Sequence, residues 1–396
     1  MSEALHVAVV TETFPPEVNG VAMTLGHMVA GLRARGHRIS LVRPRQGSDE
    51  TVTDSTTMRT TLVRGLPIPG YPSLRFGLPA PRLFRRLWRT DRPHVVQVVT
   101  EGPLGASAVA AARALDIPVI TEFHTNFHAY SRHYGFGWLE RMVSMHLRHL
   151  HNRGDLTLVP SHQLGIDLMR RGYDNIRVVA RGVDTGLFNP ARRSAALRAS
   201  WNVAPGDLVA AHVGRLAPEK NLDLVMKSFN AMRRHAPRAR LLLVGDGPAR
   251  RRLEREHPGH IYAGMRHGED LAGHYASADL FLFPSLTETY GNVTLEAMAS
   301  GLPVVAFRMA AAAELIRHGH NGMLAEPGAN AAYVRAVLDL IARPEARGRI
   351  AAAAAQSVAA FDWERIHDRM EGMLREAIQR PSASAANGPA YHFLPD

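Results

Sequence analysis

Short apolar runs, each followed by a stretch of helical character, recur along the chain, and this alternation limits the folds open to it. Such continuous apolar runs are typical of strands that are buried on both faces of a parallel sheet. In the first half, strands are expected at Val7–Val10, Ile39–Arg43, Val95–Val99, Pro118–Glu122, Leu156–Val159 and Ile176–Val179. Helices are expected at Val21–Arg35, Gly105–Ala114 and Trp138–Asn152.

The same alternation restarts in the second half. Strands are expected at Leu208–Val213, Arg240–Val244, Leu280–Phe283 and Pro303–Ala306, alternating with helices near 221–234, 248–256, 291–300 and 330–342. The pattern predicts an α/β chain of two Rossmann-like, doubly wound domains that face each other across a cleft, where the carboxyl ends of their strands collect ligands. The expected segments are a first domain over 1–185, a linker over 186–205, a second domain over 206–360, a helix over 361–379 that packs back on the first domain, and a disordered low-complexity tail over 380–396.

Composition narrows the class of protein. Of the 396 residues 46% are hydrophobic and 21% are charged, as in ordinary globular proteins. Because the chain has no cysteine, it has no disulfide framework and no thiolate metal site, which fits a reducing compartment. No apolar run reaches the roughly 18 residues of a membrane span, and the amino terminus lacks the basic region of a signal peptide. We therefore expect a cytoplasmic protein.

The formal net charge of +11 comes almost entirely from arginine, since Lys220 and Lys227 are the only lysines. An excess of positive charge favours an anionic partner such as a membrane surface, a nucleic acid or a nucleotide. A genome that encodes arginine in place of lysine on solvated faces explains the excess equally well. Nucleic acid is not expected, because no recognised motif and no interleaved aromatic side chains accompany the charge.

Residues 284–301, PSLTETYGNVTLEAMASG, place a carboxylate on each side of a helix start. The pattern predicts a loop after the strand at Leu280–Phe283 and then a helix that begins at Gly291 or Asn292 and ends at Ser300. Free N–H groups at the start of this helix would stabilise an anion. Glu288 and Glu296, displaced to either side, would instead hold hydroxyls. The arrangement suits a nucleotide sugar, although each glutamate alone could be an ordinary helix residue.

A second motif, GRLAPEKN at Gly214–Asn221, follows the first strand of the second domain. Arg215 and Lys220 flank its turn. A guanidinium and an ammonium together would clamp a diphosphate, because the first binds two oxygens and the second supplies a point charge. The alternative is a solvated turn.

These motifs resemble the retaining family 4 glycosyltransferases of the GT-B fold over about residues 5–375. Further stretches share the resemblance: TETFPPEVNGVA, ARGVDTGLFNP, LLLVGDGP, YASADLFLFPS and EAMASGLPVVA. The first domain is most similar to bacterial members that act on lipid acceptors, including mannosyl and sulfoquinovosyl transferases. That similarity lies in LPIPGYPSLRFGLPAP, EFHTNFHAYSRHYG and HNRGDLTLVPS.

The resemblance implies roles for individual residues. Arg215 and Lys220 would hold the donor diphosphate, Glu288 the hydroxyls of the transferred sugar, and Glu296 the ribose. His124 matches the active-site histidine of the family. Backbone N–H groups near Asn292 and Val293 would assist, and Gly20 would let the backbone approach a ligand closely. Asn19 departs from the double glycine of many members. The implied catalytic set is His124, Arg215, Lys220 and Glu288, and the donor-binding set is Gly20, Asn292, Val293 and Glu296.

Other site classes fit the sequence less well. Gly245-Asp246-Gly247 follows a strand, as in dinucleotide-binding proteins, but Arg250 stands where the fingerprint needs its third glycine. A glycosidase pair made of Glu288 and Glu296 would leave Arg215 and Lys220 without a task. No metal and no other cofactor is expected, because the histidines lack metal-binding spacing and the Arg/Lys pair can neutralise a leaving diphosphate.

The segment 81–92, PRLFRRLWRTDR, has two interpretations. Its apolar residues lie on one helical face with arginines around them, which is typical of a helix lying in a membrane interface. The other interpretation is an amphipathic helix that packs on its own sheet. The two sets of residues are Leu83, Phe84, Leu87 and Trp88, and Arg82, Arg85, Arg86 and Arg89.

The sequence thus predicts a retaining, metal-independent hexosyltransferase. It would move a hexose from GDP-mannose or a UDP-hexose to a membrane lipid or glycolipid, and it could contact the anionic inner face of the plasma membrane. A transferase for a soluble metabolite or polysaccharide, and a non-catalytic nucleotide-sugar-binding protein, are the alternatives.

Overall fold

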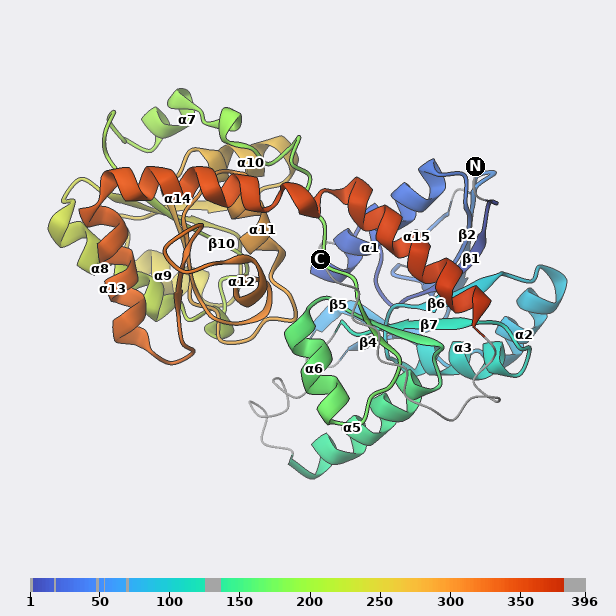
Figure 1. The fold of residues 1–396 in the computed structure, drawn as a ribbon. Helices are drawn as coiled ribbons and strands as arrows, with labels where there is room; N and C mark the ends of the chain where they lie inside the picture. The colour runs from blue at the N-terminus through green and yellow to red at the C-terminus, as the bar shows by residue number, and fades with distance from the viewer. Residues whose placement is uncertain are drawn as a thin grey trace. The chain divides into compact units, whose positions relative to one another are not determined.

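The computed structural model describes residues 3–17, 19–47, 50–52, 54–68, 71–124 and 137–380, with the backbone alone for 68, 71–74 and 137–140. The chain forms two compact units (Figure 1). One contains Met1–Arg181 and the chain from Trp363 onward, and the other contains Gly182–Asp362. Of the predicted disordered tail over 380–396, residues 381–396 lie outside the described residues, and Arg380 hydrogen-bonds to Asp155 and Asn175.

A parallel seven-stranded sheet forms the centre of the first unit, in the order β3-β2-β1-β6-β7-β8-β9. Strands β1, β6, β7 and β8 are buried along their whole length, as the apolar runs predict. Strands β4 and β5 pair as a separate antiparallel hairpin. The strands are β1 (His6–Val10), β2 (Arg38–Pro44), β3 (Met58–Val63), β4 (Gly65–Ile68), β5 (Tyr71–Gly77), β6 (Val95–Val98), β7 (Val119–Glu122), β8 (Leu156–Val159) and β9 (Ile176–Val178). The helices are α1 (Gly20–Ala34), α2 (Pro81–Thr90), α3 (Pro103–Arg113), α5 (Gly137–Asn152), α6 (His162–Arg170) and α15 (Trp363–Gln379).

Helix α15 belongs to this unit although it follows the second unit in sequence. It lies beside α1 (Figure 1) and also contacts β6 and β7. Trp363 stacks on His27 with the ring centroids 4.6 Å apart. A Cβ atom at Gly31 would lie 2.2 Å from the His367 ring, so a glycine in α1 permits the close packing of the two helices.

The apolar face of α2 is part of the core of the first unit. Phe84 and Trp88 are buried and stack on each other, and they join a cluster that includes Leu104 of α3. The interpretation of residues 81–92 as a helix whose apolar face enters lipid is therefore wrong, and the packed interpretation is confirmed. Periodicity could not decide between them, since a protein core and a lipid interface both select an apolar face. The arginines of α2 remain exposed: Arg82, Arg85, Arg86 and Arg89.

The second unit contains a parallel six-stranded sheet in the order β12-β11-β10-β13-β14-β15. Its core lies where α8 and α13 pack on the sheet, around Phe229, Leu243 and Tyr333. The strands are β10 (Val209–Val213), β11 (Arg240–Val244), β12 (Ile261–Gly264), β13 (Leu280–Phe283), β14 (Val304–Phe307) and β15 (Met323–Ala325). The α-helices are α7 (Ala195–Ser200), α8 (Leu222–His235), α9 (Arg250–Glu256), α10 (Gly268–Ala276), α11 (Asn292–Ala299), α12 (Ala310–Leu315), α13 (Asn330–Ala342) and α14 (Pro344–Ser357). Three short 3₁₀ helices, η1 (Pro190–Arg192), η2 (Pro218–Lys220) and η3 (Ala359–Phe361), complete the unit.

Residues 186–205, expected as a linker, lie inside the second unit. Arg193 and Arg198 both bind the carboxylate of Asp279, at 2.7 and 3.0 Å, and so fix this segment to the end of α10. The boundary between the units falls instead between Arg181 and Gly182. Within the described ranges, no helix combines the length and the apolar character needed to cross a bilayer.

Candidate active site

The loops after β10 and β11 pack backbone against backbone at the carboxyl edge of the second sheet. A Cβ atom at Gly245 would lie 2.0 Å from the carbonyl oxygen of Gly214, and one at Gly247 would lie 2.5 Å from that of Leu216. Both glycines also have positive φ, at 126° and 157°. The two glycines of Gly245-Asp246-Gly247 therefore allow the GRLAPEKN loop to pack closely against this loop. This packing explains the glycine pattern without a dinucleotide-binding site.

Lys220 and Glu288 meet in this region. Lys220 ends η2, Glu288 lies in the loop after β13, and their side chains form an ion pair in which both are largely buried. The ammonium also lies 5.5 Å from the centroid of the Phe283 ring, within the range of a cation–π contact. The backbone N–H of Leu286 donates to the Glu219 carbonyl at 2.9 Å and so joins the two loops. Two residues that the sequence places in different motifs thus share one site.

Arg215 lies in the same loop as Lys220 and is more exposed. Its guanidinium is 3.4 Å from the Glu219 carboxylate, four residues along the chain. Both cations are thus paired with carboxylates, Arg215 within its own loop and Lys220 across to the loop after β13.

Glu296 lies on α11 and binds a residue that the sequence analysis did not single out. Tyr275 is the first residue of the YASADLFLFPS stretch and lies near the end of α10. Its hydroxyl donates to the Glu296 carboxylate at 2.8 Å. Desolvation raises the pKa of Glu296, and the hydrogen bond from Tyr275 opposes this rise. Tyr275 is itself buried between Phe188 and Phe281, so the position of the Glu296 carboxylate is fixed by packing as well as by the hydrogen bond.

Helix α11 begins where the sequence predicts. Gly291 is its N-cap residue, with φ 91°, and offers no side chain to cap the first turn. The predicted donor-binding residues Asn292 and Val293 are the first two residues of the helix, and Gly301 follows its end with φ 75°. The backbone N–H groups of Asn292 and Val293 lie at the positive end of the helix dipole, close in sequence to Glu288.

His212 is a further polar residue of this region that the sequence analysis missed. It is fully buried on β10, and its Nδ1 lies 2.9 Å from the Leu282 carbonyl oxygen, while Nε2 has no hydrogen-bond partner among the described residues. Burial, with a smaller contribution from the charge of Lys220, lowers its pKa to about 4, although the hydrogen bond with Leu282 opposes the shift. The imidazole is therefore neutral at physiological pH, with Nδ1 as the donor to Leu282.

The predicted residues of the first unit lie at the carboxyl edge of its own sheet. Gly20 opens α1, and a Cβ atom there would meet none of the described neighbouring atoms within 4 Å, so packing among the described residues does not require glycine. Asn19 is the N-cap: its Oδ1 accepts from the N–H groups of Val21 and Ala22 at 3.1 and 2.9 Å. The asparagine that departs from the double glycine thus satisfies two N–H groups that a glycine would leave open.

His124 follows β7 and has both ring nitrogens engaged. Nδ1 lies 2.5 Å from the Arg181 guanidinium, and Nε2 lies 2.7 Å from Glu122. Because a guanidinium can only donate, Nδ1 is the acceptor and Nε2–H donates to Glu122. Gln97 also donates to the Glu122 carboxylate. Desolvation alone would raise the pKa of Glu122, but its interactions with His124 and Arg181 outweigh that effect and hold the pKa below its usual value.

Two further carboxylates lie at this edge. Glu12 follows β1 and accepts from the N–H of Gly77 at 3.3 Å, and Glu101 follows β6 and accepts from the N–H of His124 at 3.3 Å. Burial raises the pKa of Glu12 to about 7, and the charge of Glu101 contributes to the rise. None of Glu12, Glu101, Glu122 and Arg181 was predicted as a site residue, although the motifs quoted above contain all of them except Glu101.

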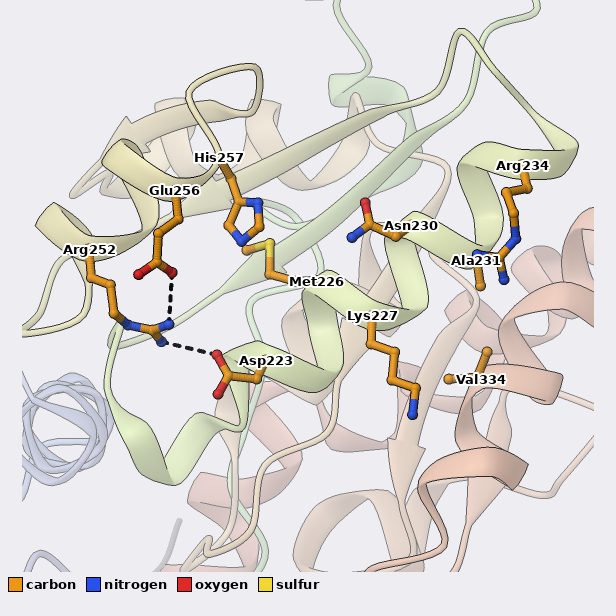
Figure 2. Close-up of a pocket in the computed structure, with 10 residues that line it drawn as sticks. All are labelled: Asp223, Met226, Lys227, Asn230, Ala231, Arg234, Arg252, Glu256, His257 and Val334. Atoms are coloured by element: carbon orange, nitrogen blue, oxygen red, sulfur yellow. Dashed lines mark hydrogen bonds and ion pairs between the residues drawn. The ribbon is translucent and has the colours of Figure 1, made fainter.

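A pocket of about 520 Å³ lies on the second unit between α8 and α9, away from the residues described above (Figure 2). Its Arg252 is neutralised by Asp223 and Glu256, each at 3.0 Å. None of the predicted donor residues lines it. In the part of the chain that the structure describes, no three His, Asp or Glu side chains gather as a metal site.

Comparison with known proteins identifies the family. A model described as Glycosyltransferase Family 4 matches residues 18–187, and one described as Glycosyl transferases group 1 matches residues 207–343. A GDP-mannose-dependent alpha-mannosyltransferase of Mycobacterium tuberculosis is 33% identical over 96% of this chain and 99% of its own length. The chain belongs to glycosyltransferase family 4.

Other proteins similar to this glycosyltransferase agree. The sulfoquinovosyl transferase SQD2 of Arabidopsis thaliana is 32% identical over 92% of this chain and 72% of its own. An alpha-monoglucosyldiacylglycerol synthase of Streptococcus pneumoniae is 26% identical over 76% and 71%. Among solved structures, sucrose-phosphate synthase from Thermosynechococcus elongatus superposes with a TM-score of 0.76 at 19% identity, covering 94% of this chain and 98% of that one. The glycosyltransferase thus has the GT-B fold, with a Rossmann-like α/β unit in each half, as the sequence predicts.

Proposed function

We propose that this glycosyltransferase moves a hexose from a nucleotide-diphosphate sugar to a membrane lipid or glycolipid, with retention of the anomeric configuration. The observation that carries the proposal is the meeting of Lys220 and Glu288, with Arg215 in the same loop and Glu296 on the adjoining helix. Cations for a diphosphate and carboxylates for hydroxyls are the groups that a nucleotide sugar requires. GDP-mannose, which the mycobacterial relative's name specifies, is the first donor to test, followed by UDP-hexoses.

Each residue has a part in the proposed reaction. Arg215 and Lys220 bind the diphosphate, with the N–H groups of Asn292 and Val293 beside them. Glu288 binds hydroxyls of the hexose, and Glu296 binds those of the ribose. In the first unit, Gly20 admits a close approach of the ligand to the backbone, and His124 lies beside the reacting sugar.

Transfer breaks the bond between the anomeric carbon and the diphosphate oxygen and forms a bond to the acceptor oxygen on the same face. The departing diphosphate oxygen takes the acceptor proton, so no carboxylate nucleophile is needed. The negative charge that grows on the leaving group is met by Arg215, Lys220 and the start of α11, which are in place before the reaction begins. We infer that this arrangement works without a metal ion.

The lipid acceptor is supported by two observations. The name of the pneumococcal relative specifies diacylglycerol, and the first unit carries exposed arginines on α2 that would be attracted to anionic lipid. We infer that the first unit binds the acceptor at the membrane surface and that the second unit binds the donor.

A donor screen tests the function directly. The protein is incubated with GDP- and UDP-sugars and a lipid acceptor in detergent, and release of the nucleotide diphosphate is measured with and without a chelator. Proton NMR of the product gives the anomeric coupling. An inverted product or strict dependence on a divalent ion would contradict the mechanism. Binding of a donor without any release would indicate a non-catalytic sugar-nucleotide-binding protein, and transfer to soluble acceptors alone would exclude the lipid assignment.

A further inference from the structure

Helix α5 has one side fixed in the first unit. Leu147 and Leu150 are buried, and Leu147 lies in a cluster with Phe123, Leu168 and Tyr173. Figure 1 shows α5 at the edge of the unit, next to α6. Its inner side is therefore ordinary core, and the orientation of its outer side is set by that packing.

The outer side of α5 combines exposed methionines with positive charge. Met142 is 60% exposed and Met145 is 48% exposed, and no large apolar side chain in the described ranges is more exposed than Met142. Arg141, His146, Arg148 and His149 are exposed on the same helix. Their spacing follows the helical repeat, so the six residues form one stripe over two turns, which we call the α5 stripe: Arg141, Met142, Met145, His146, Arg148 and His149.

No acidic residue occurs between Arg141 and Asn152. Arg148 donates to the Arg171 carbonyl oxygen at 3.4 Å, and no carboxylate of the described residues forms an ion pair with it. The stripe therefore has the charge that an anionic surface attracts, together with two flexible apolar side chains that adapt to a disordered apolar layer.

Helix α2 provides the contrast within the same unit. It has more arginines than α5, but Phe84 and Trp88 are buried and Leu83 and Leu87 pack against the same core, so α2 has no exposed large apolar side chain comparable to Met142. Binding of a charged surface alone to anionic lipid is lost when high salt screens the charges. Binding through inserted apolar side chains persists at high salt.

We propose that the α5 stripe contacts an anionic lipid bilayer, with Met142 and Met145 entering the headgroup region and Arg141 and Arg148 facing anionic headgroups. The proposal rests on the proposed function in that a lipid acceptor places the first unit at a membrane. The new statement is that helix α5 is the element that contacts the membrane.

Vesicle sedimentation of the full chain tests the contact, with phosphatidylglycerol mixed into phosphatidylcholine and with phosphatidylcholine alone. We expect binding to the anionic vesicles only. Changing both methionines, M142Q with M145Q, should lower the binding on the order of tenfold and abolish the part that survives high salt. The matched control is Met23→Gln, which changes an exposed methionine of α1 in the same unit.

Fluorescence provides an independent measurement, because the chain has no cysteine and a single introduced one can be labelled specifically. An environment-sensitive dye at Met142→Cys should shift to the blue on anionic vesicles, and the same dye at Met23→Cys should not. Unchanged binding of the double methionine variant, or no shift at position 142, overturns the proposal. A shift that depends on protein concentration without vesicles would show instead that the stripe joins two copies of the chain.

The outcome is separable from that of the proposed function. Transfer to a detergent-solubilised acceptor does not require a bilayer, so the methionine variants should transfer at the wild-type rate in detergent. Vesicle binding that is absent while transfer in detergent proceeds removes the contact and leaves the function standing. Vesicle binding by a protein that releases no nucleotide diphosphate removes the function and leaves the contact standing.

Discussion

Lys220 and Glu288 form an ion pair although they are 68 positions apart in the sequence and lie in loops that follow different strands. Both side chains are largely buried, so each compensates a charge that would otherwise be costly to desolvate. An anion that approaches Lys220 competes with Glu288 for the ammonium. We therefore expect the arrival of the donor diphosphate to free the Glu288 carboxylate for sugar hydroxyls.

The first prediction concerns this cation. Lys220→Ala should weaken donor binding and transfer by roughly 2–4 kcal/mol, that is about thirty- to a thousandfold, because a charge-assisted contact to the diphosphate is lost. The matched control is Lys227→Ala, which removes the only other lysine, on the exposed side of α8. Calorimetry with the nucleotide diphosphate measures the affinity. Equal affinities for Lys220→Ala and Lys227→Ala would remove Lys220 from the donor site.

The second prediction separates the two glutamates. Glu296→Ala should weaken the free nucleotide diphosphate and the nucleotide sugar alike, because both carry the ribose. Glu288→Ala should weaken only the sugar donor, and it should leave the nucleotide diphosphate bound at least as well, since Lys220 loses its competitor. Tyr275→Phe removes a single hydrogen bond to Glu296. It should weaken the binding of both ligands by about 0.5–1.5 kcal/mol. Calorimetric titration of both ligands into each variant measures these affinities. If Glu288→Ala and Glu296→Ala changed the two affinities in the same way, the assignment of Glu288 to the hexose and Glu296 to the ribose would be refuted.

The placement of the candidate donor-site residues follows largely from the sequence, because these residues are concentrated in local motifs. GRLAPEKN supplies Arg215 and Lys220, and the start of α11 follows from a glycine and the apolar run after it. The partners of these residues were not predictable in the same way. Tyr275 reaches Glu296 across 21 residues and Arg181 reaches His124 across 57, and only the order of strands in the sheets brings each pair together.

The missed strands have a comparable cause. Strand β3 reads MRTTLV and is mostly half-buried at the edge of its sheet, so it lacks the continuous apolar run by which the inner strands were recognised. The hairpin of β4 and β5 contains Pro67 and Pro72, which weaken a strand pattern. Sequence periodicity identifies strands at the centre of a sheet better than those at its margins.

The third prediction concerns the positioning of His124. Glu122→Gln keeps an acceptor near Nε2 but removes the charge, and it should lower kcat about tenfold with little change in the KM for the donor. Glu122→Ala should lower kcat further, because it removes the carboxylate that lies against both Arg181 and His124. Thermal melts of both variants serve as the control for a purely structural effect. Wild-type kcat in a well-folded Glu122→Gln protein would show that His124 needs no such support.

The fourth prediction concerns the arginines of α2. Changing Arg82, Arg85, Arg86 and Arg89 together to Gln should weaken binding to anionic vesicles at low salt and have little effect at high salt, where their charges are screened. Release of nucleotide diphosphate from the donor should be unaffected. Trp88→Ala is not a test of membrane contact, since its buried indole makes a loss of about 3–5 kcal/mol in stability the expected result. Undiminished binding of the Gln variant at low salt would exclude α2 from the membrane surface.

The fifth prediction concerns pH and Glu12, a half-buried residue whose carboxyl group packs against the backbone of Gly77 and Gly102. Its pKa rises from 4.5 to about 7 on folding, chiefly through desolvation. Between these values the folded chain holds a proton that the unfolded chain has released, so the stability contributed by Glu12 is present at low pH and falls as the pH rises toward 7. Glu12→Gln keeps the neutral shape and should therefore stabilise the protein at pH values above about 7, by roughly 2–3 kcal/mol relative to its effect near pH 5. Melting temperatures of Glu12→Gln and the wild-type protein across this range measure the difference. A difference between Glu12→Gln and wild type that does not change with pH would mean that Glu12 ionises normally in the folded protein.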